Sequence, residues 1–324
     1  MLDLVRVSPA DQDLDWLKTA LQAAVELELA TIPPYLCAMW SVKENADPVR
    51  SMIRDIAIEE MAHMATACNL PTAIGGTPAI NTIDAVPKYP GPLPGEVHPG
   101  LVVPLAGLSR DLIWNVFMEI ELPFSGPVLF AEGMAFPTIG AFYETIARAY
   151  EQLPPDAITG ERQIEVGAGT GAAFTIADRL DAKQAISRIK EQGEGSSNSP
   201  LGDPDTNPLT DDLAHYYQVA EIFYGRRLVA VDGLFEFVGD VIPFPDVLPM
   251  AEVPPAGYPE SADFDQAYKS ILDKLQSAWE NGDQSAMNIS VSDMFALESE
   301  AVALMETPLP GGGGTFGPDF KLPS

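Results

Sequence analysis

Residues 57–67 read AIEEMAHMATA, which places two carboxylates and an imidazole among alanines and methionines. Alanine and methionine favour helix, and in a helix Glu60 and His63 lie one turn apart on the same face. That face continues an apolar stripe of Val49, Ile53 and Ile56. Buried charged groups are costly unless they are paired or bind a metal. The stretch therefore predicts either a solvated face or an internal site that requires these side chains.

A third carboxylate follows the apolar stripe of an earlier helix. Ser8, with a proline directly after it, predicts the start of this helix. The stripe then runs through leucines 14, 17 and 21 to Glu28. Glu26 falls on a more polar face, because positions two apart are about 200° apart around a helix. Pro33 removes a backbone donor shortly after Glu28, so we expect the helix to kink or restart there.

The segment SRDLIWNVFMEIEL, residues 109–122, predicts another helix and offers two candidate ligands. Glu119 and Glu121 are two positions apart, so only one of them can face the core. The periodicity does not separate them cleanly. Glu121 shares the bulkier face with Trp114 and Phe117 and is the preferred candidate.

The segment HYYQVAEIFYGRR, residues 215–227, lies in a helix expected to run from near Thr210 to about Phe237. The chain has 3 histidines, and His215 is a natural partner for His63. Glu221 lies about 120° from His215 around the helix axis, which is not the usual spacing of a ligand pair. Either only one of these two side chains binds a metal directly, or the helix is locally distorted.

The remaining patterns predict an all-α fold. Helical periodicity recurs at residues 138–153 and 181–192 and in a C-terminal helical pair, whereas prolines dominate the excursion 71–104. Few segments have strand character. We expect a four-helix bundle with long crossover insertions. Residues 1–240 are expected to form this bundle, and residues 241–324 a C-terminal helical extension packed on the same domain.

The charge balance narrows the classes of partner. The chain has 18 basic and 47 acidic residues and a net charge of -29, which disfavours nucleic acid and anionic membrane surfaces. No apolar run is long enough to span a membrane, and the first residues do not resemble a secretory signal. Cys37 and Cys68 lie in apolar helical contexts that favour buried thiols. A cytoplasmic protein is therefore expected.

The inward carboxylates and imidazoles together are typical of a metal site. In bundles with a metal in the core, two helices each contribute one glutamate and two contribute Glu-x-x-His. A cation offsets the charge of convergent carboxylates, and neutral imidazole adds nitrogen ligands. We expect one or two iron ions, with manganese as the alternative. Glu59 then lies to the side, as a second-layer or surface acid.

Several segments together resemble the ferritin-like domain of the iminophenylpyruvate dimer synthases, enzymes of violacein- and rebeccamycin-type bisindole biosynthesis. These segments are ELELATIPPYL, IEEMAHM, FMEIELPF, TIGAFYETI, AISRIKEQGEG, HYYQVAEIFYGRRL and GTFGPDF. The resemblance implies a ferritin-like bundle whose metal ligands are Glu28, Glu60, His63, Glu121, His215 and Glu221. It also implies that Glu194, in QGEG, lines the mouth of a pocket.

The synthases are longer than this chain, which is expected to act as a stand-alone metal-dependent protein. The leading hypothesis is an oxidoreductase acting on a small organic substrate, with no catalytic residue assigned. The alternatives are a non-catalytic metal-binding or iron-handling protein, and a domain whose buried acids only bond to one another. The sequence does not distinguish a monomer from a homo-oligomer.

Overall fold

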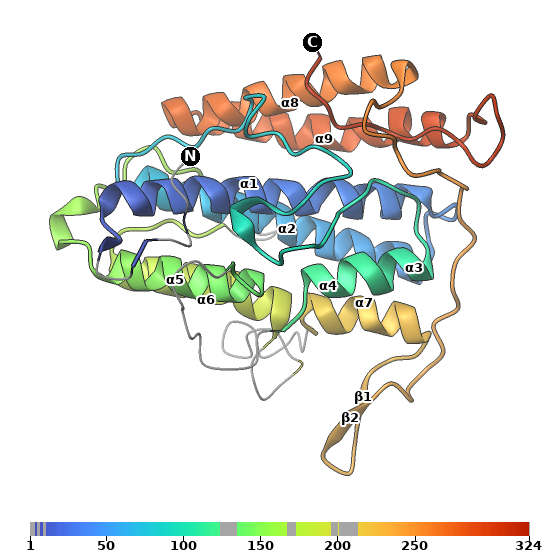
Figure 1. The fold of residues 1–324 in the computed structure, drawn as a ribbon, viewed down its shortest axis with the longest axis horizontal. Coiled ribbons are helices and arrows are strands. Elements are labelled where there is room, and N and C mark those ends of the chain that lie inside the picture. The colour runs from blue at the N-terminus through green and yellow to red at the C-terminus, as the bar shows by residue number, and fades with distance from the viewer. Residues whose placement is uncertain are drawn as a thin grey trace.

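The computed structural model describes residues 4, 7–8, 11–123, 135–166, 173–195, 200 and 213–323. Its helices form three layers (Figure 1). The central layer contains α1 (Leu14–Ser41) and α2 (Pro48–Ala73), and one outer layer contains α8 (Ala262–Asn281) and α9 (Gln284–Met305). The other outer layer contains the shorter helices α3 (Arg110–Leu112), α4 (Met118–Ile120), α5 (Ile139–Glu151), α6 (Arg179–Glu194) and α7 (His215–Tyr224).

Little of the described chain is strand. β1 (Val229–Val231) and β2 (Leu234–Glu236) form an antiparallel hairpin, and single 3-10 turns lie at Pro94–Glu96, Pro155–Ala157 and Pro259–Ser261. The predicted all-α class is therefore confirmed. Among the described residues, no helix combines the length and apolarity needed to cross a membrane. Cys37 and Cys68 are free and buried, as predicted.

Helix α1 starts later than the sequence predicted and continues further. Its cap is Asp13 rather than Ser8, and the Asp13 carboxylate accepts hydrogen bonds from the Asp15 and Trp16 amides at 3.1 and 2.9 Å. The helix continues through both internal prolines to Ser41 instead of restarting. Pro34 leaves the carbonyl of Ala30 without its helical donor, and the Tyr89 hydroxyl donates to that carbonyl at 2.7 Å.

Asp13→Ala should lower the free energy of unfolding by about 1 kcal/mol, because it leaves two amides of the first turn without an acceptor. Ser8→Ala is the matched control and should change it by less than about 0.5 kcal/mol. Urea unfolding of both variants measures the difference. Equal effects would contradict the assignment of the cap to Asp13.

The layer of short helices covers the face of α1 and α2 that carries the candidate ligands. The ends of these short helices meet there. Glu121 is the C-cap of α4, Glu194 ends α6 and His215 begins α7. The prediction of one long helix over residues 210–237 is therefore wrong for residues 213–237, which the structure describes. Helix α7 stops after Tyr224 because Gly225 adopts a left-handed conformation with φ of 69°, and the hairpin follows. Thr210 lies outside the described residues.

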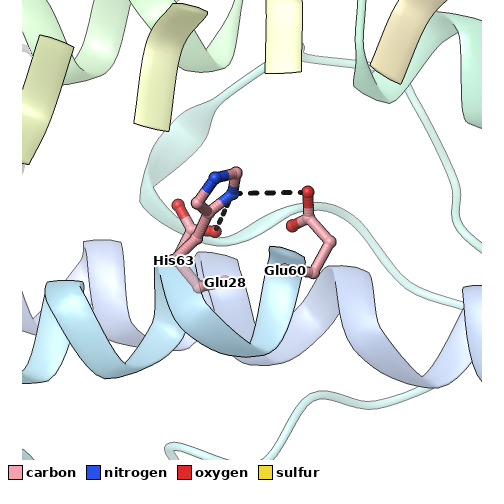
Figure 2. A group of neighbouring side chains, drawn as sticks. All are labelled: Glu28, Glu60 and His63. Carbon is pink, nitrogen blue, oxygen red and sulfur yellow. Dashed lines mark ion pairs between the residues drawn. The ribbon is translucent and has the colours of Figure 1, made fainter. Parts of the chain in front are cut away.

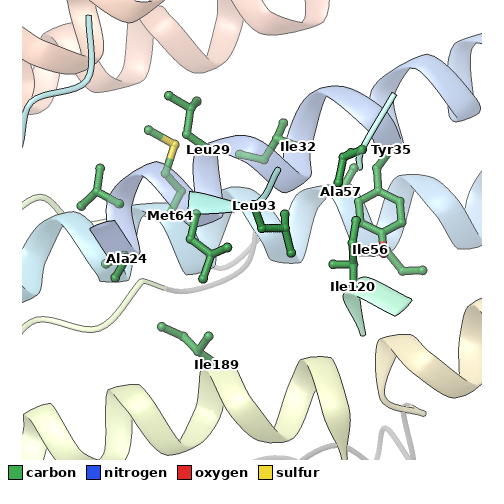
Figure 3. Packing of buried hydrophobic residues seen from close by; sticks show 14 of the residues in the cluster. Ala24, Leu29, Ile32, Tyr35, Ile56, Ala57, Met64, Leu93, Ile120 and Ile189 are labelled. Atoms are coloured by element: carbon green, nitrogen blue, oxygen red, sulfur yellow. The ribbon is translucent and has the colours of Figure 1, made fainter. Parts of the chain in front are cut away.

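The two C-terminal helices pack on the central pair, and each buries apolar side chains. On α8 these include Phe264, Tyr268, Ile271 and Leu275. On α9, Leu297 and Ala301 are buried. One continuous hydrophobic cluster runs through all three layers. Figure 3 shows the part of it between the central helices and the layer of short helices. The central helices are therefore covered on both sides, and any polar group between layers must find an internal partner.

Candidate metal centre

The first group of candidate ligands lies where α1 and α2 face each other. Glu28, Glu60 and His63 are each at most 4% exposed. The Nδ1 atom of His63 lies 3.5 Å from Glu60 Oε1 and 4.0 Å from Glu28 Oε2. Figure 2 shows all three side chains pointing away from the central helices toward the layer of short helices. One ligand atom from each lies within 4.8 Å of those of the other two.

The second group adds a residue from each of two short helices. His215 Nδ1 lies 2.9 Å from Glu60 Oε1 and 3.7 Å from Glu121 Oε2. One ligand atom each from Glu60, Glu121 and His215 again lies within 4.8 Å of the others. The imidazole rings of His63 and His215 are 5.6 Å apart between centroids. The two groups share Glu60, so this carboxylate can bridge two cation positions.

Both imidazoles are held by the nitrogen that faces away from the centre. The Nε2 atom of His215 lies 2.8 Å from Glu59 Oε2, and that of His63 lies 3.1 Å from Gln192 Oε1. An ionised carboxylate only accepts hydrogen bonds, so Nε2 of His215 carries the proton. Its Nδ1 atom then faces Glu60 and Glu121, and it must be free of a proton to bind a metal. Metal-binding histidines are commonly oriented in this way by an acceptor on their outer nitrogen.

Three hydroxyl groups hold the three carboxylates. Tyr143 donates to Glu28 Oε1 at 2.5 Å, Thr31 to Glu60 Oε2 at 2.7 Å and Tyr35 to Glu121 Oε1 at 2.6 Å. The other oxygen of each carboxylate faces an imidazole. Sequence reasoning missed these donors. Thr31 and Tyr35 lie three and seven positions after Glu28 on the same helix, which was the available signal.

The charges of the centre are strongly perturbed. Burial, and then the negative charge of Glu60, raise the pKa of Glu28 to about 8. For Glu60 burial acts in the raising direction, but the two neighbouring imidazoles of His215 and His63 outweigh it and lower the pKa. Burial likewise opposes the charged form of His63, yet the bond and charge of Glu60 raise its pKa. Without a cation, protons compensate the buried negative charge.

The residues fit a divalent cation. His215 Nδ1 is buried and has no hydrogen-bond partner of suitable geometry, although Glu60 Oε1 is close. Three carboxylates and two imidazoles form the mixed oxygen and nitrogen donor set that iron and manganese accept. Residues that are already oriented by a hydroxyl or an acceptor need little rearrangement to bind such an ion.

The structure decides which of Glu119 and Glu121 faces the core, a choice that the periodicity left open. Glu121 is 3% exposed. Glu119 points away from the centre, and its Oε2 atom lies 3.0 Å from His98 Nε2. A π-helical segment at Ile113–Phe117 explains the ambiguity, because its wider turn shifts the phase of every later position.

Glu194 is buried at the end of α6. Its Oε1 atom accepts a hydrogen bond from the Gly140 amide at 2.7 Å, which joins the end of α6 to the start of α5. A side chain at position 140 would overlap this carboxylate, so glycine permits the contact. Glu194 therefore braces the junction of short helices beside the centre. Glu59 occupies the second-layer position expected for it, on the outer nitrogen of His215.

Glu221 is buried but lies outside both ligand groups. Its Oε2 atom accepts a hydrogen bond from Arg227 at 2.6 Å, and its Oε1 atom one from the Leu228 amide at 2.7 Å. Both oxygens are thus occupied at the far end of α7, almost two turns from His215. Of the two candidates on this helix, only His215 joins the cluster.

Glu221→Gln should leave the metal content of the purified protein unchanged, because Arg227 and the turn after α7 hold this carboxylate. Its effect should appear as a loss of stability of about 1–3 kcal/mol from the broken charge-assisted bonds. Elemental analysis and urea unfolding check both parts. Loss of metal from a folded variant would show that Glu221 is a ligand after all.

A helical core with two overlapping carboxylate–imidazole groups is the arrangement found in bundle proteins that bind a metal through carboxylates. Residues 21–224 match the Ferritin-like family, and the chain belongs to that family. The chain is also similar in structure to a ferritin-like protein from Caulobacter vibrioides, with a TM-score of 0.67 and 20% identity. That match covers 96% of this chain and 98% of the other, and it confirms the predicted ferritin-like fold. No curated protein matches the sequence.

Proposed function

We propose that this protein is a metal-dependent oxidoreductase that acts on a small organic substrate. The observation that supports this most directly is the pair of buried ligand groups sharing Glu60. One group would hold a cation through Glu28, Glu60 and His63, and the other through Glu60, Glu121 and His215. The centre would contain one or two ions, with iron expected and manganese as the alternative.

A redox-active ion held by these residues would supply the activation of dioxygen or peroxide. The protein supplies the surroundings. Thr31, Tyr35 and Tyr143 fix the carboxylates by hydrogen bonds. Burial, and then the neighbouring carboxylates, raise the pKa of both tyrosines well above its ordinary value, so the phenols remain donors. The covered core excludes bulk water from the reacting centre.

The resemblance of several segments to the iminophenylpyruvate dimer synthases supports an oxidative reaction on a small organic molecule as the finer assignment. We further propose a cytoplasmic location, which is consistent with the two free buried thiols. The protein would act without nucleic acid or membrane partners, and either as a monomer or as a homo-oligomer.

Oxygen consumption by the iron-loaded protein tests the oxidoreductase assignment. A panel of small amino, imino and aromatic acids should include at least one substrate that stimulates consumption in wild type but not in His63→Ala. The second candidate is an iron-handling protein, which the ligand groups also permit. It would take up and oxidise ferrous iron without any substrate-dependent consumption, and that result would overturn the enzyme assignment.

Metal affinity should increase as the pH rises through about 8. Burial, and then the charge of Glu60, raise the pKa of Glu28 to about 8, so a proton occupies this carboxylate below that pH. A cation must displace this proton in order to bind. Below the pKa, each proton displaced lowers the metal affinity about tenfold for each unit by which the pH falls. The increase should level off above that range. Titration with manganese from pH 6 to pH 9, with proton release measured in parallel, checks the sign. A flat profile would contradict it.

A further inference from the structure

A cavity lies on the opposite side of the central helices from the metal centre. It occupies the space between α1 and α2 and the C-terminal pair α8 and α9, with a volume of about 150 Å³. Its walls are almost entirely apolar and include methionines 39, 61, 64, 287 and 294. Methionine side chains adapt to irregular ligands. Apolar cavities of about this size can bind an apolar molecule.

The cavity is long and narrow. Along α2 its wall extends from Arg50 to Ala65, which is about 22 Å at 1.5 Å per residue. Along α1 it extends from Leu29 to Trp40, about 16 Å. A volume of about 150 Å³ distributed over such a length leaves a small cross-section. That shape fits a single hydrocarbon chain better than a fused ring system.

The charged lining residues gather at one end. They are Arg50, Arg54 and Glu298. Arg50 and Glu298 neutralise each other through a bond of 2.6 Å. Within the part of the chain that the structure describes, Arg54 bonds to Asp55 and Ser51, and its pair with Asp55 is exposed and of the kind that contributes little. Arg54 and the exposed Phe295 mark the open side, so a ligand would bury its chain and leave its head near a guanidinium.

The central helices separate this cavity from the metal centre. Leu29 and Met64 line the cavity, whereas the adjacent residues Glu28 and His63 face the opposite layer. Figure 3 shows Leu29 and Ile32 on the side of α1 away from Ile189 of α6, and Figure 2 shows the ligands on the other side. The cavity is therefore a separate site, and occupancy does not depend on the metal or on the proposed reaction.

We propose that this cavity binds a single-chain amphiphile with an anionic head, of the medium-chain fatty-acid class. The chain would lie along α2 between Met61 and Met64 and the C-terminal helices, and the carboxylate would lie beside Arg54. Each buried methylene contributes about 0.8 kcal/mol, so most of the affinity would come from the chain. The arginine would select the sign of the head group.

Calorimetric titration of the full chain with decanoate, decanol and decyltrimethylammonium tests the proposal. Decanoate should bind with one molecule per chain and more tightly than the ammonium. Met294→Trp, which fills the cavity from its partly exposed side, should weaken decanoate and decanol at least about tenfold. Arg54→Gln should weaken decanoate about two- to fivefold and leave decanol unchanged. Lys183→Gln, with the same loss of charge on α6, should change neither.

Three outcomes would overturn the site. The first is no decanoate binding by folded wild type. The second is binding that survives both Met294→Trp and Ile58→Trp, the latter covering the case in which the first variant does not fold. The third is equal affinity for decanoate and the ammonium, which would refute the anionic head. Circular dichroism of each variant confirms folding. Since none of these readouts uses metal or turnover, they remain interpretable if the oxidoreductase assignment fails.

Discussion

Glu60→Gln is expected to empty both cation positions at once. Glu60 belongs to both ligand groups, and its Oε1 atom faces both imidazoles. Loss of an outer hydrogen-bond partner commonly lowers metal affinity 10- to 100-fold, so loss of a shared ligand should cost more than about 100-fold. Elemental analysis of protein purified without chelator, before and after reconstitution with ferrous iron, measures the effect.

Two glutamates in one segment provide a second ligand variant and its matched control. Glu121→Gln should deplete only the position next to His215 and leave the one formed by Glu28 and His63. Glu119→Gln changes the same residue type two positions away, where the side chain pairs with His98 outside the centre, and should retain full metal content. Equal metal in wild type and folded Glu60→Gln, or equal losses in the two controls, would refute the assigned centre.

Asn69→Ala is expected to cause the largest loss of stability among these variants, at least about 3 kcal/mol. Asn69 is fully buried in α2. Its Nδ2 atom donates to the carbonyls of Ile164 and Phe174 at 3.0 and 2.8 Å. Its Oδ1 atom accepts from the Ile164 amide at 3.0 Å and from Trp279 Nε1 at 2.8 Å. Removing the amide leaves these groups buried without partners.

Asn281→Ala is the control for this variant. Asn281 is exposed, and among the described residues it bonds to Ser277 of the same helix. Its loss should therefore change the free energy of unfolding by less than about 0.5 kcal/mol. Urea unfolding followed by circular dichroism and by tryptophan fluorescence measures both variants. An Asn69→Ala protein as stable as the control would show that the link between α2 and α8 contributes little.

Much of the fold was predictable because helix formation is a local property. The periodicity of apolar residues located the central pair and the C-terminal pair. The segment 109–122 predicted a helix, and the structure begins one there with Ser109 as its cap. The same periodicity placed Glu28, Glu60 and His63 on inward faces. Mid-helix ligands continue a stripe, and a stripe can be read from one segment alone.

The sequence by itself therefore determined the all-α class, the two long central helices and the three candidate ligands they carry. Only the tertiary structure decided the rest of the centre. Glu121 and His215 lie at helix ends. A π-helical turn or a short helix there gives no reliable helical periodicity from which the inward face can be predicted. Contacts such as Tyr35 with Glu121 and Glu59 with His215 join residues 86 and 156 positions apart. Local patterns contain no information on such pairs, because packing between layers brings them together.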